Sequence, residues 1–120
     1  MSEDVTRAVV DRHLEAWRQG DIPALVADFT DDAVMMSAAG GALKGKQEIG
    51  AMLGEVFGTL FRPDDTTLDV GAIIVSGDHA LVHWTVTTST VRTTGGFDTF
   101  VLRDGKIAAQ CSGAEIVPLA

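Results

Sequence analysis

The feature that most constrains the fold is a change of pattern at Thr66, where helical periodicity gives way to β-branched residues. Upstream, residues 46–60 repeat apolar side chains at i, i+3, i+4 and i+7, which predicts an amphipathic helix. Downstream, three turn signals, at 76–78, 94–96 and 103–106, divide the chain into four expected strands, 66–76, 79–91, 97–103 and 106–117. Helices followed by a meander of strands predict an α+β fold.

Two more helices are expected near the N-terminus. The first ends at Gly20 and gathers six residues in one arc of the helical wheel: Val9, Val10, His13, Leu14, Ala16 and Trp17. The second spans 22–28 with Asp21 as its cap, and a first strand should follow at 33–37 before a loop at Gly40-Gly41. At 120 residues the chain is expected to form a single domain, 1–120. Three helices on one face of a bent sheet would enclose a pocket.

Charge and cysteine content exclude several classes of partner. The formal net charge of −8 repels nucleic-acid phosphates and anionic bilayers. No run approaches the roughly 18 apolar residues that span a membrane. Cys111 is the only cysteine and the N-terminal segment is acidic, so we expect a cytoplasmic protein without disulfides that binds neither nucleic acid nor membranes.

An acidic residue lies among apolar ones in the strand expected at 97–103. Period two places Asp98, Phe100 and Leu102 on one face. A carboxylate on such a face is disfavoured as the anion, so it is either hydrogen-bonded for structural reasons or its pKa is raised for acid/base work. The second interpretation is favoured if this face lines the pocket.

His13 interrupts the apolar arc of the first helix, between Val9 and Trp17 at helical spacing. It could be a core histidine that donates to a carbonyl group. It could equally be an acid/base group, because histidine changes charge near neutral pH. A contact with Asp98 would make an acid/base pair, and only the fold can decide whether that contact exists.

Five segments together carry a resemblance to a known family: Gly20-Asp21, Phe29-Thr30-Asp31-Asp32-Ala33-Val34, Gly45-Lys46-Gln47-Glu48-Ile49, Phe97-Asp98-Thr99-Phe100 and Asp104-Gly105-Lys106-Ile107. In this order and spacing the chain resembles the nuclear transport factor 2-like superfamily, and within it SnoaL-like polyketide cyclases and ketosteroid isomerases. The resemblance implies an α+β cone (cystatin-like) in which a curved antiparallel or mixed sheet wraps around three helices and a deep cavity. It also implies a homodimer packed through the outer sheet face. Many chemistries share this fold, so it does not determine function.

The resemblance assigns roles to three positions. Asp98 matches the strand aspartate that looks like the oxyanion-side acid of the isomerases and the acid/base aspartate of the cyclases. His13 falls where the isomerases place a hydrogen-bonding tyrosine, and Ser37 falls where they place the aspartate that abstracts a proton. A serine without an adjacent base cannot perform that transfer near neutral pH, and the chain has no tyrosine. We therefore do not expect steroid isomerisation by the usual mechanism.

The remaining pocket residues follow from the apolar pattern and the resemblance together. The expected wall and substrate-binding residues are Trp17, Phe29, Met35, Met52, Val56, Trp84, Val86 and Phe100, with Ser37, Gln110 and Ser112 as polar groups. The register of the last hairpin stays open: a two-residue turn at Asp104-Gly105 sets Asp98 opposite Cys111, whereas a three-residue loop sets it opposite Gln110. The resemblance favours the longer loop, with Cys111 outside the pocket.

The sequence thus predicts a protein that binds a small, largely apolar molecule carrying a carbonyl or enol oxygen. Asp98 and His13 would act as an acid/base pair in an isomerase, cyclase or dehydratase that needs no cofactor. No metal site is expected, because the three histidines and Cys111 lack ligand spacing. The alternatives are a binding domain without catalysis and a protein-interaction subunit that uses the threonine-rich outer face of 79–91.

Overall fold

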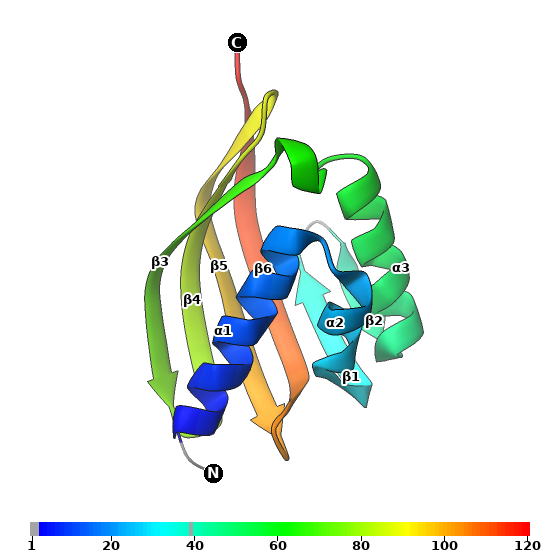
Figure 1. Ribbon diagram of the computed structural model, residues 1–120, viewed down its shortest axis with the longest axis vertical. Coiled ribbons are helices and arrows are strands. Elements are labelled where there is room, and N and C mark those ends of the chain that lie inside the picture. Colours follow the sequence, from blue (N-terminus) through cyan, green and yellow to red (C-terminus); the bar gives the residue numbers. More distant parts are fainter. Residues whose placement is uncertain (1–2, 39) are drawn as a thin grey trace.

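The computed structural model describes residues 3–38 and 40–120, and in it helices cover one face of a curved sheet (Figure 1). The elements in chain order are α1 (Glu3–Gln19), α2 (Ile22–Ala27), β1 (Phe29–Ser37), β2 (Gly41–Lys44), α3 (Gly45–Gly58), the 3-10 turn η1 (Pro63–Asp65), β3 (Thr67–Ser76), β4 (His79–Thr87), β5 (Val91–Arg103) and β6 (Lys106–Pro118). This arrangement confirms the expected α+β class. The Asp21 cap is also confirmed, since its Oδ1 accepts a hydrogen bond from Ala24 N at 3.2 Å.

The strands form one mixed sheet in the order β2-β1-β6-β5-β4-β3. Among the described strands, β1 and β6 form the one parallel pair, and the first strand of the chain therefore lies beside the last. The four C-terminal strands form the expected meander, and α1 lies across its concave face (Figure 1). The core lies between these layers, with Val10, Phe29, Ile49 and Val82 each fully buried.

The first two strands differ from the expectation. β1 begins at Phe29 rather than at 33, and residues 41–44, expected in a loop, pair with it as β2. The chain reverses because Ser37 Oγ accepts a hydrogen bond from Gly40 N at 2.8 Å and Gly41 has a φ of +71°. The glycine pair therefore makes a hairpin possible rather than releasing the chain into a loop.

The expected turn at 94–96 was wrong. The chain turns earlier, where Thr88 Oγ1 accepts hydrogen bonds from Thr90 N and Val91 N at 3.1 and 3.0 Å. Gly95 and Gly96 instead lie inside β5, close to where its register shifts against both neighbouring strands, and Gly96 pairs with Trp84 on β4. Threonine side chains can bond to nearby backbone groups and so form turns, a signal weaker in sequence than a glycine pair.

The outer face of the sheet carries a row of small and apolar residues that runs across neighbouring strands. The paired positions in this row are Ile74, Leu81, Thr99, Cys111 and Met36. The two ends of the row are solvent-accessible, with Ile74 56% and Met36 46% exposed. The homodimer expected through this face stays a prediction. No helix among the described residues has the length and apolar character needed to cross a membrane.

Candidate functional site

A cavity of about 280 Å³ lies between the helices and the concave face of the sheet. Its wall is mostly apolar, and α1 and α3 provide one side while β1, β3, β4, β5 and β6 provide the other. Asp98 and His13 both line it, as does every residue expected in the wall or as a polar group except Phe100. The structure therefore brings together on one surface residues that are scattered over the whole sequence.

Phe100 does not line the cavity, which corrects its assignment as a substrate-binding residue. It is 1% exposed and belongs to the core beneath α1. Its ring packs edge-on against the His13 ring, with 5.8 Å between centroids and an angle of 79°. Phe100 lies on the same face of β5 as Asp98, two residues further along the strand. At that position α1 packs directly on the sheet, so the Phe100 side chain is in the core rather than in the cavity wall.

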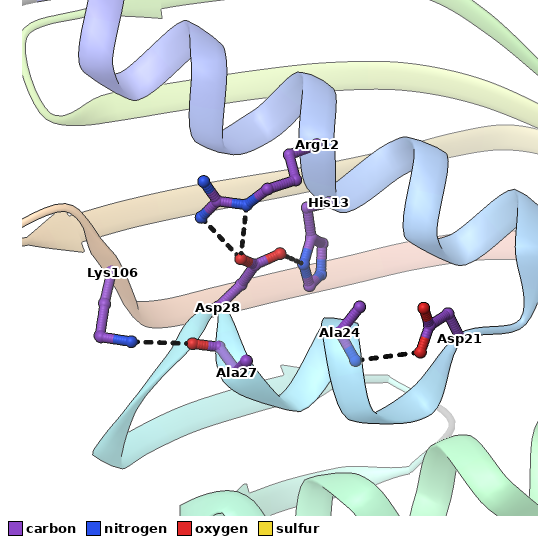
Figure 2. A network of polar contacts seen from close by, with 7 residues as sticks. All are labelled: Arg12, His13, Asp21, Ala24, Ala27, Asp28 and Lys106. Carbon is purple, nitrogen blue, oxygen red and sulfur yellow. Dashed lines mark hydrogen bonds and ion pairs between the residues drawn. The ribbon is translucent and has the colours of Figure 1, made fainter.

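Asp28 was not singled out from the sequence, and it lies at the centre of a polar network (Figure 2). Its Oδ2 lies 2.9 Å from His13 Nδ1. Its Oδ1 accepts hydrogen bonds from Arg12 Nε at 3.0 Å and Arg12 Nη2 at 2.7 Å. Lys106 Nζ donates to Ala27 O beside it at 2.9 Å, which places a cation at the C-terminal end of α2. The start of β6 is thereby joined to the same network.

A signal for this network was present in the sequence. Asp28 ends α2, where the negative end of the helix dipole disfavours an acidic side chain unless a cation lies nearby. Burial opposes ionisation of Asp28, but the hydrogen bonds and charges of His13 and Arg12 outweigh it, so the pKa of this carboxyl lies below its ordinary value. Asp28 is therefore a carboxylate at neutral pH.

The Asp28 carboxylate determines how His13 is held. Because a carboxylate can only accept, Nδ1 of His13 carries the proton in their hydrogen bond. The rings of Phe29 and Phe100 pack edge-on against the imidazole at 5.3 and 5.8 Å and hold its plane. Nε2 is thus the nitrogen left to a molecule in the cavity, and in the neutral ring it is a proton acceptor.

Asp98 lies on the opposite side of the cavity, on β5. Ser112 Oγ donates a hydrogen bond to Asp98 Oδ1, and Gln110 Nε2 in turn donates to Ser112 Oγ at 3.3 Å. Burial raises the pKa of Asp98 above its ordinary value, and this effect exceeds the lowering by Ser112, Gln110, the charge of His13 and the Trp84 indole. Asp98 therefore keeps its proton to a higher pH than a solvated aspartate does.

Asp98 and His13 share the cavity without a direct bond. Among the described residues, the hydrogen bonds of His13 go to Asp28 and those of Asp98 to Ser112. When His13 is protonated, its charge lowers the pKa of Asp98, so the two groups interact across the cavity. A ligand between them would have an acid on one side and a base on the other.

The turn before β6 has two residues, which corrects the three-residue loop. Asp104 and Gly105 have φ values of +53° and +76°, and Arg103 pairs with Lys106 on either side of them. Two central residues with positive φ form the turn type that suits a tight hairpin. The Asp-Gly pair is among the strongest hairpin signals in any sequence, and here it outweighed the resemblance.

A β-bulge close to this turn then shifts the register, so neither expected pairing of Asp98 occurs. Asp98 pairs with Ser112 rather than with Cys111 or Gln110. The one-residue shift directs Gln110 and Ser112 into the cavity and leaves Cys111 opposite Thr99 on the outer face. In residues 3–38 and 40–120, no three His, Cys, Asp or Glu side chains gather where they could hold a metal ion.

Solved structures with the same architecture have low sequence identity to this chain. A SnoaL-like protein of unknown function from Burkholderia thailandensis E264 is 16% identical with a TM-score of 0.80, over 96% of this chain and 98% of that one. A proposed ketosteroid isomerase from Kribbella flavida DSM 17836 is 17% identical with a TM-score of 0.79, over 93% and 78% of the two chains. An LEH-like epoxide hydrolase from M. tuberculosis is 17% identical with a TM-score of 0.74, over 93% and 84%. At these identities the similarity is one of fold.

No curated protein sequence matches the chain with statistical significance. The family model of the SnoaL-like domain, however, matches residues 10–110. That range extends from α1 to the cavity-facing part of β6 and includes His13, Asp28, Asp98 and Gln110. The chain therefore belongs to the SnoaL-like domain family.

Proposed function

We propose that this protein is an acid/base enzyme, an isomerase, cyclase or dehydratase, that acts on a small and largely apolar molecule bearing a carbonyl oxygen. One observation carries the proposal: a single apolar cavity holds an imidazole fixed by a carboxylate and, across from it, a carboxyl group with a raised pKa. Environments that shift the pKa values of two acidic groups in opposite directions are typical of acid/base sites. Here the pKa of Asp28 is lowered and the pKa of Asp98 is raised.

In the proposed mechanism His13 is the base and Asp98 is the acid. Nε2 of His13 removes a proton from the carbon next to the substrate carbonyl, and Asp28 stabilises the imidazolium that forms. Asp98 gives its proton to the oxygen that gains charge, either a carbonyl that becomes an enol or a hydroxyl that leaves as water. Each turnover leaves His13 with an extra proton and Asp98 without one, and return of that proton through solvent or product restores the site.

Two similarities of fold support an enzyme. The structures of a proposed ketosteroid isomerase and of an LEH-like epoxide hydrolase share the architecture of this chain. We do not propose the usual steroid mechanism, because Ser37 stands where its base would be and the Ser37 oxygen already accepts a hydrogen bond from Gly40 N. The base proposed here comes from α1 instead of β1.

The test is turnover of a panel of polyketide-like and terpenoid ketones by the wild type, Asp98→Asn and His13→Gln. Loss of a general acid or base lowers the rate by about 10²–10⁴-fold, and each variant should fall in that range. Cys111→Ser is the matched control, because Cys111 lies outside the cavity and should leave the rate unchanged. Turnover that is equal in Asp98→Asn and the wild type would refute the proposal.

A binding domain without turnover is the second candidate. The observation in its favour is that Asp98 already has a partner in Ser112, so its carboxyl could serve the structure alone. Tight binding of a ketone that the wild type never converts, with equal affinity in Asp98→Asn, would favour this alternative.

A further inference from the structure

The cavity contains two polar atoms that the fold leaves without partners. Among the described residues, the buried side-chain nitrogen and oxygen atoms that make no hydrogen bond are Trp84 Nε1 and Gln110 Oε1. Both residues line the cavity. A buried donor or acceptor without a partner lowers the stability of the folded state, so such atoms are rare in native structures. Their location on one cavity suggests a missing ligand.

The two unpaired atoms have opposite character. The indole nitrogen of Trp84 can only donate a hydrogen bond, and the carbonyl oxygen of Gln110 can only accept one. The Gln110 amide is oriented by its neighbours: Ser112 donates to Asp98, so it must accept from Gln110 Nε2, which turns Oε1 away from Ser112. Besides His13 and Asp98, the cavity thus offers one unpaired donor and one unpaired acceptor in a mostly apolar wall.

Both side chains lie near Asp98. The Trp84 indole and the Gln110 amide each lower the pKa of its carboxyl, although neither makes a well-formed hydrogen bond to it. A single compact molecule seated over Asp98 can therefore reach both atoms. Because the two atoms are buried in the unliganded structure, binding must be accompanied by a small change in the torsions of these side chains, as is common at binding surfaces.

We propose that the ligand of this cavity is a hydroxy-ketone: a compact, largely apolar molecule with a carbonyl oxygen for Trp84 Nε1–H and a hydroxyl hydrogen for Gln110 Oε1. This inference rests on the proposed function and deepens it, since the proposal above requires only the carbonyl. The cavity of about 280 Å³ lies just below the roughly 300–1,000 Å³ seen for ligand pockets, which suits a skeleton of one or two rings. A hydroxyl near the ketone would also be the group that a dehydratase removes.

The test compares binding of one skeleton with and without each polar group. Dissociation constants are measured by calorimetry for 3-hydroxy- and 4-hydroxy-1-tetralone, for 1-tetralone and for tetralin. One neutral hydrogen bond changes affinity by about two- to tenfold, so a hydroxy-ketone should bind more tightly than 1-tetralone, and 1-tetralone more tightly than tetralin. Equal affinity across the series, or no binding of either hydroxy-ketone at millimolar concentration, would overturn the proposal.

Two variants locate the effect. Trp84→Phe removes the donor and should weaken binding of both ketone types about fivefold, whereas Gln110→Met removes the acceptor and should weaken only the hydroxy-ketone. Cys111→Ser is the control, since Cys111 lies opposite Thr99 on the outer face of the sheet and should leave every dissociation constant unchanged. If the ligand preference of the wild type persists in both variants, the assignment of the two atoms is wrong. A variant that does not fold leaves the wild-type series as the deciding measurement.

Failure of this proposal is separable from failure of the catalytic one. The dissociation constant of 4-hydroxy-1-tetralone is read without dehydration, because its hydroxyl is not β to the carbonyl and cannot be eliminated through the enol, and Asp98 is intact throughout. Selective binding of a hydroxy-ketone that Asp98→Asn converts as fast as the wild type would remove the catalytic role and keep the ligand class. Turnover that depends on Asp98 but is the same for ketones with and without the hydroxyl would keep the catalytic role and remove the ligand class.

Discussion

The Nδ1 atom of His13 lies 2.9 Å from Oδ2 of Asp28, in a contact where both side chains are almost fully buried. The contact joins α1 to the residue that ends α2, and Arg12 from the same turn of α1 holds the other carboxylate oxygen (Figure 2). The backbone carbonyl of Asp28 also accepts a hydrogen bond from Ile107 N at 2.7 Å. Asp28 thus connects two helices and the start of β6, and it holds His13, the proposed general base.

We expect Asp28→Asn to destabilise the protein by about 3 kcal/mol, because it removes the buried carboxylate that holds His13 Nδ1 and the Arg12 guanidinium. Urea denaturation at pH 7 measures the change. Asp31→Asn is the control: the Asp31 side chain is 98% exposed, and its pairing with Lys46 at 3.4 Å lies on the surface. Its effect should stay within about 0.5 kcal/mol. Equal effects of the two substitutions would contradict the structural role of Asp28.

The pH dependence of that difference follows from the lowered pKa of Asp28. In the unfolded chain an aspartate titrates near about pH 3.9, and in the folded protein Asp28 titrates below that. Its stabilising contribution is therefore complete above about pH 4 and is lost as the pH falls through the folded pKa. The gap in unfolding free energy between the wild type and Asp28→Asn should shrink in acid, and a gap that widens below pH 4 would contradict this.

Asp98 should behave in the opposite way because burial raises its pKa. Between the unfolded value of about 3.9 and the higher folded value, the unfolded chain loses its proton first, so ionisation lowers stability as the pH rises. We expect Asp98→Asn to be more stable than the wild type at pH 7, with the advantage vanishing below about pH 4. Denaturation curves from pH 3 to pH 8 test this. Lower stability of the variant at pH 7 would show that Asp98 serves the fold rather than chemistry.

The contrast between Asp98 and Asp28 shows which features of the site could be predicted from the sequence. Period two on one strand was sufficient to place Asp98 on an apolar face. The position of Asp28 at the end of α2 indicated that it needs a nearby cation, but its partners could not be predicted because they come from another helix, and its burial depends on how α1, α2 and β6 meet. A residue's face follows from its own element, whereas its partners follow from the packing of several.

The same limit explains the hairpin at Asp104-Gly105. The turn could be identified from two residues, but the register beyond it depends on a bulge whose extra residue carries no sequence mark of its own. Gln110 and Ser112 reach the cavity through that bulge and not through the longer loop that was expected. The pairing of Asp98 with Ser112 therefore had to come from the structure.

Gly96 offers a test of the misassigned turn. In β5 it lies under Trp84, and a Cβ atom there would be 2.5 Å from the Trp84 carbonyl oxygen and 2.6 Å from the indole Cε3. Since backbone and a packed ring would both have to move, Gly96→Ala should lower stability by about 2–3 kcal/mol and disturb the cavity wall. Gly58→Ala, with no atom within 4 Å of its Cβ, should be neutral or slightly stabilising in thermal unfolding. A neutral Gly96→Ala would mean that the segment is the exposed turn first expected.

The outer sheet face leads to the last prediction, a homodimer in solution. Ile74, Leu81, Thr99, Cys111 and Met36 form a row across neighbouring strands, with both ends exposed. A charged side chain in the middle of that row would be buried without a partner if two copies met there. Thr99→Arg should therefore convert a dimer into a monomer in sedimentation equilibrium, whereas an arginine at the exposed Gln47 on α3 should not. A wild type that is monomeric at all concentrations, or a Thr99→Arg variant that remains dimeric, would exclude this face as the interface.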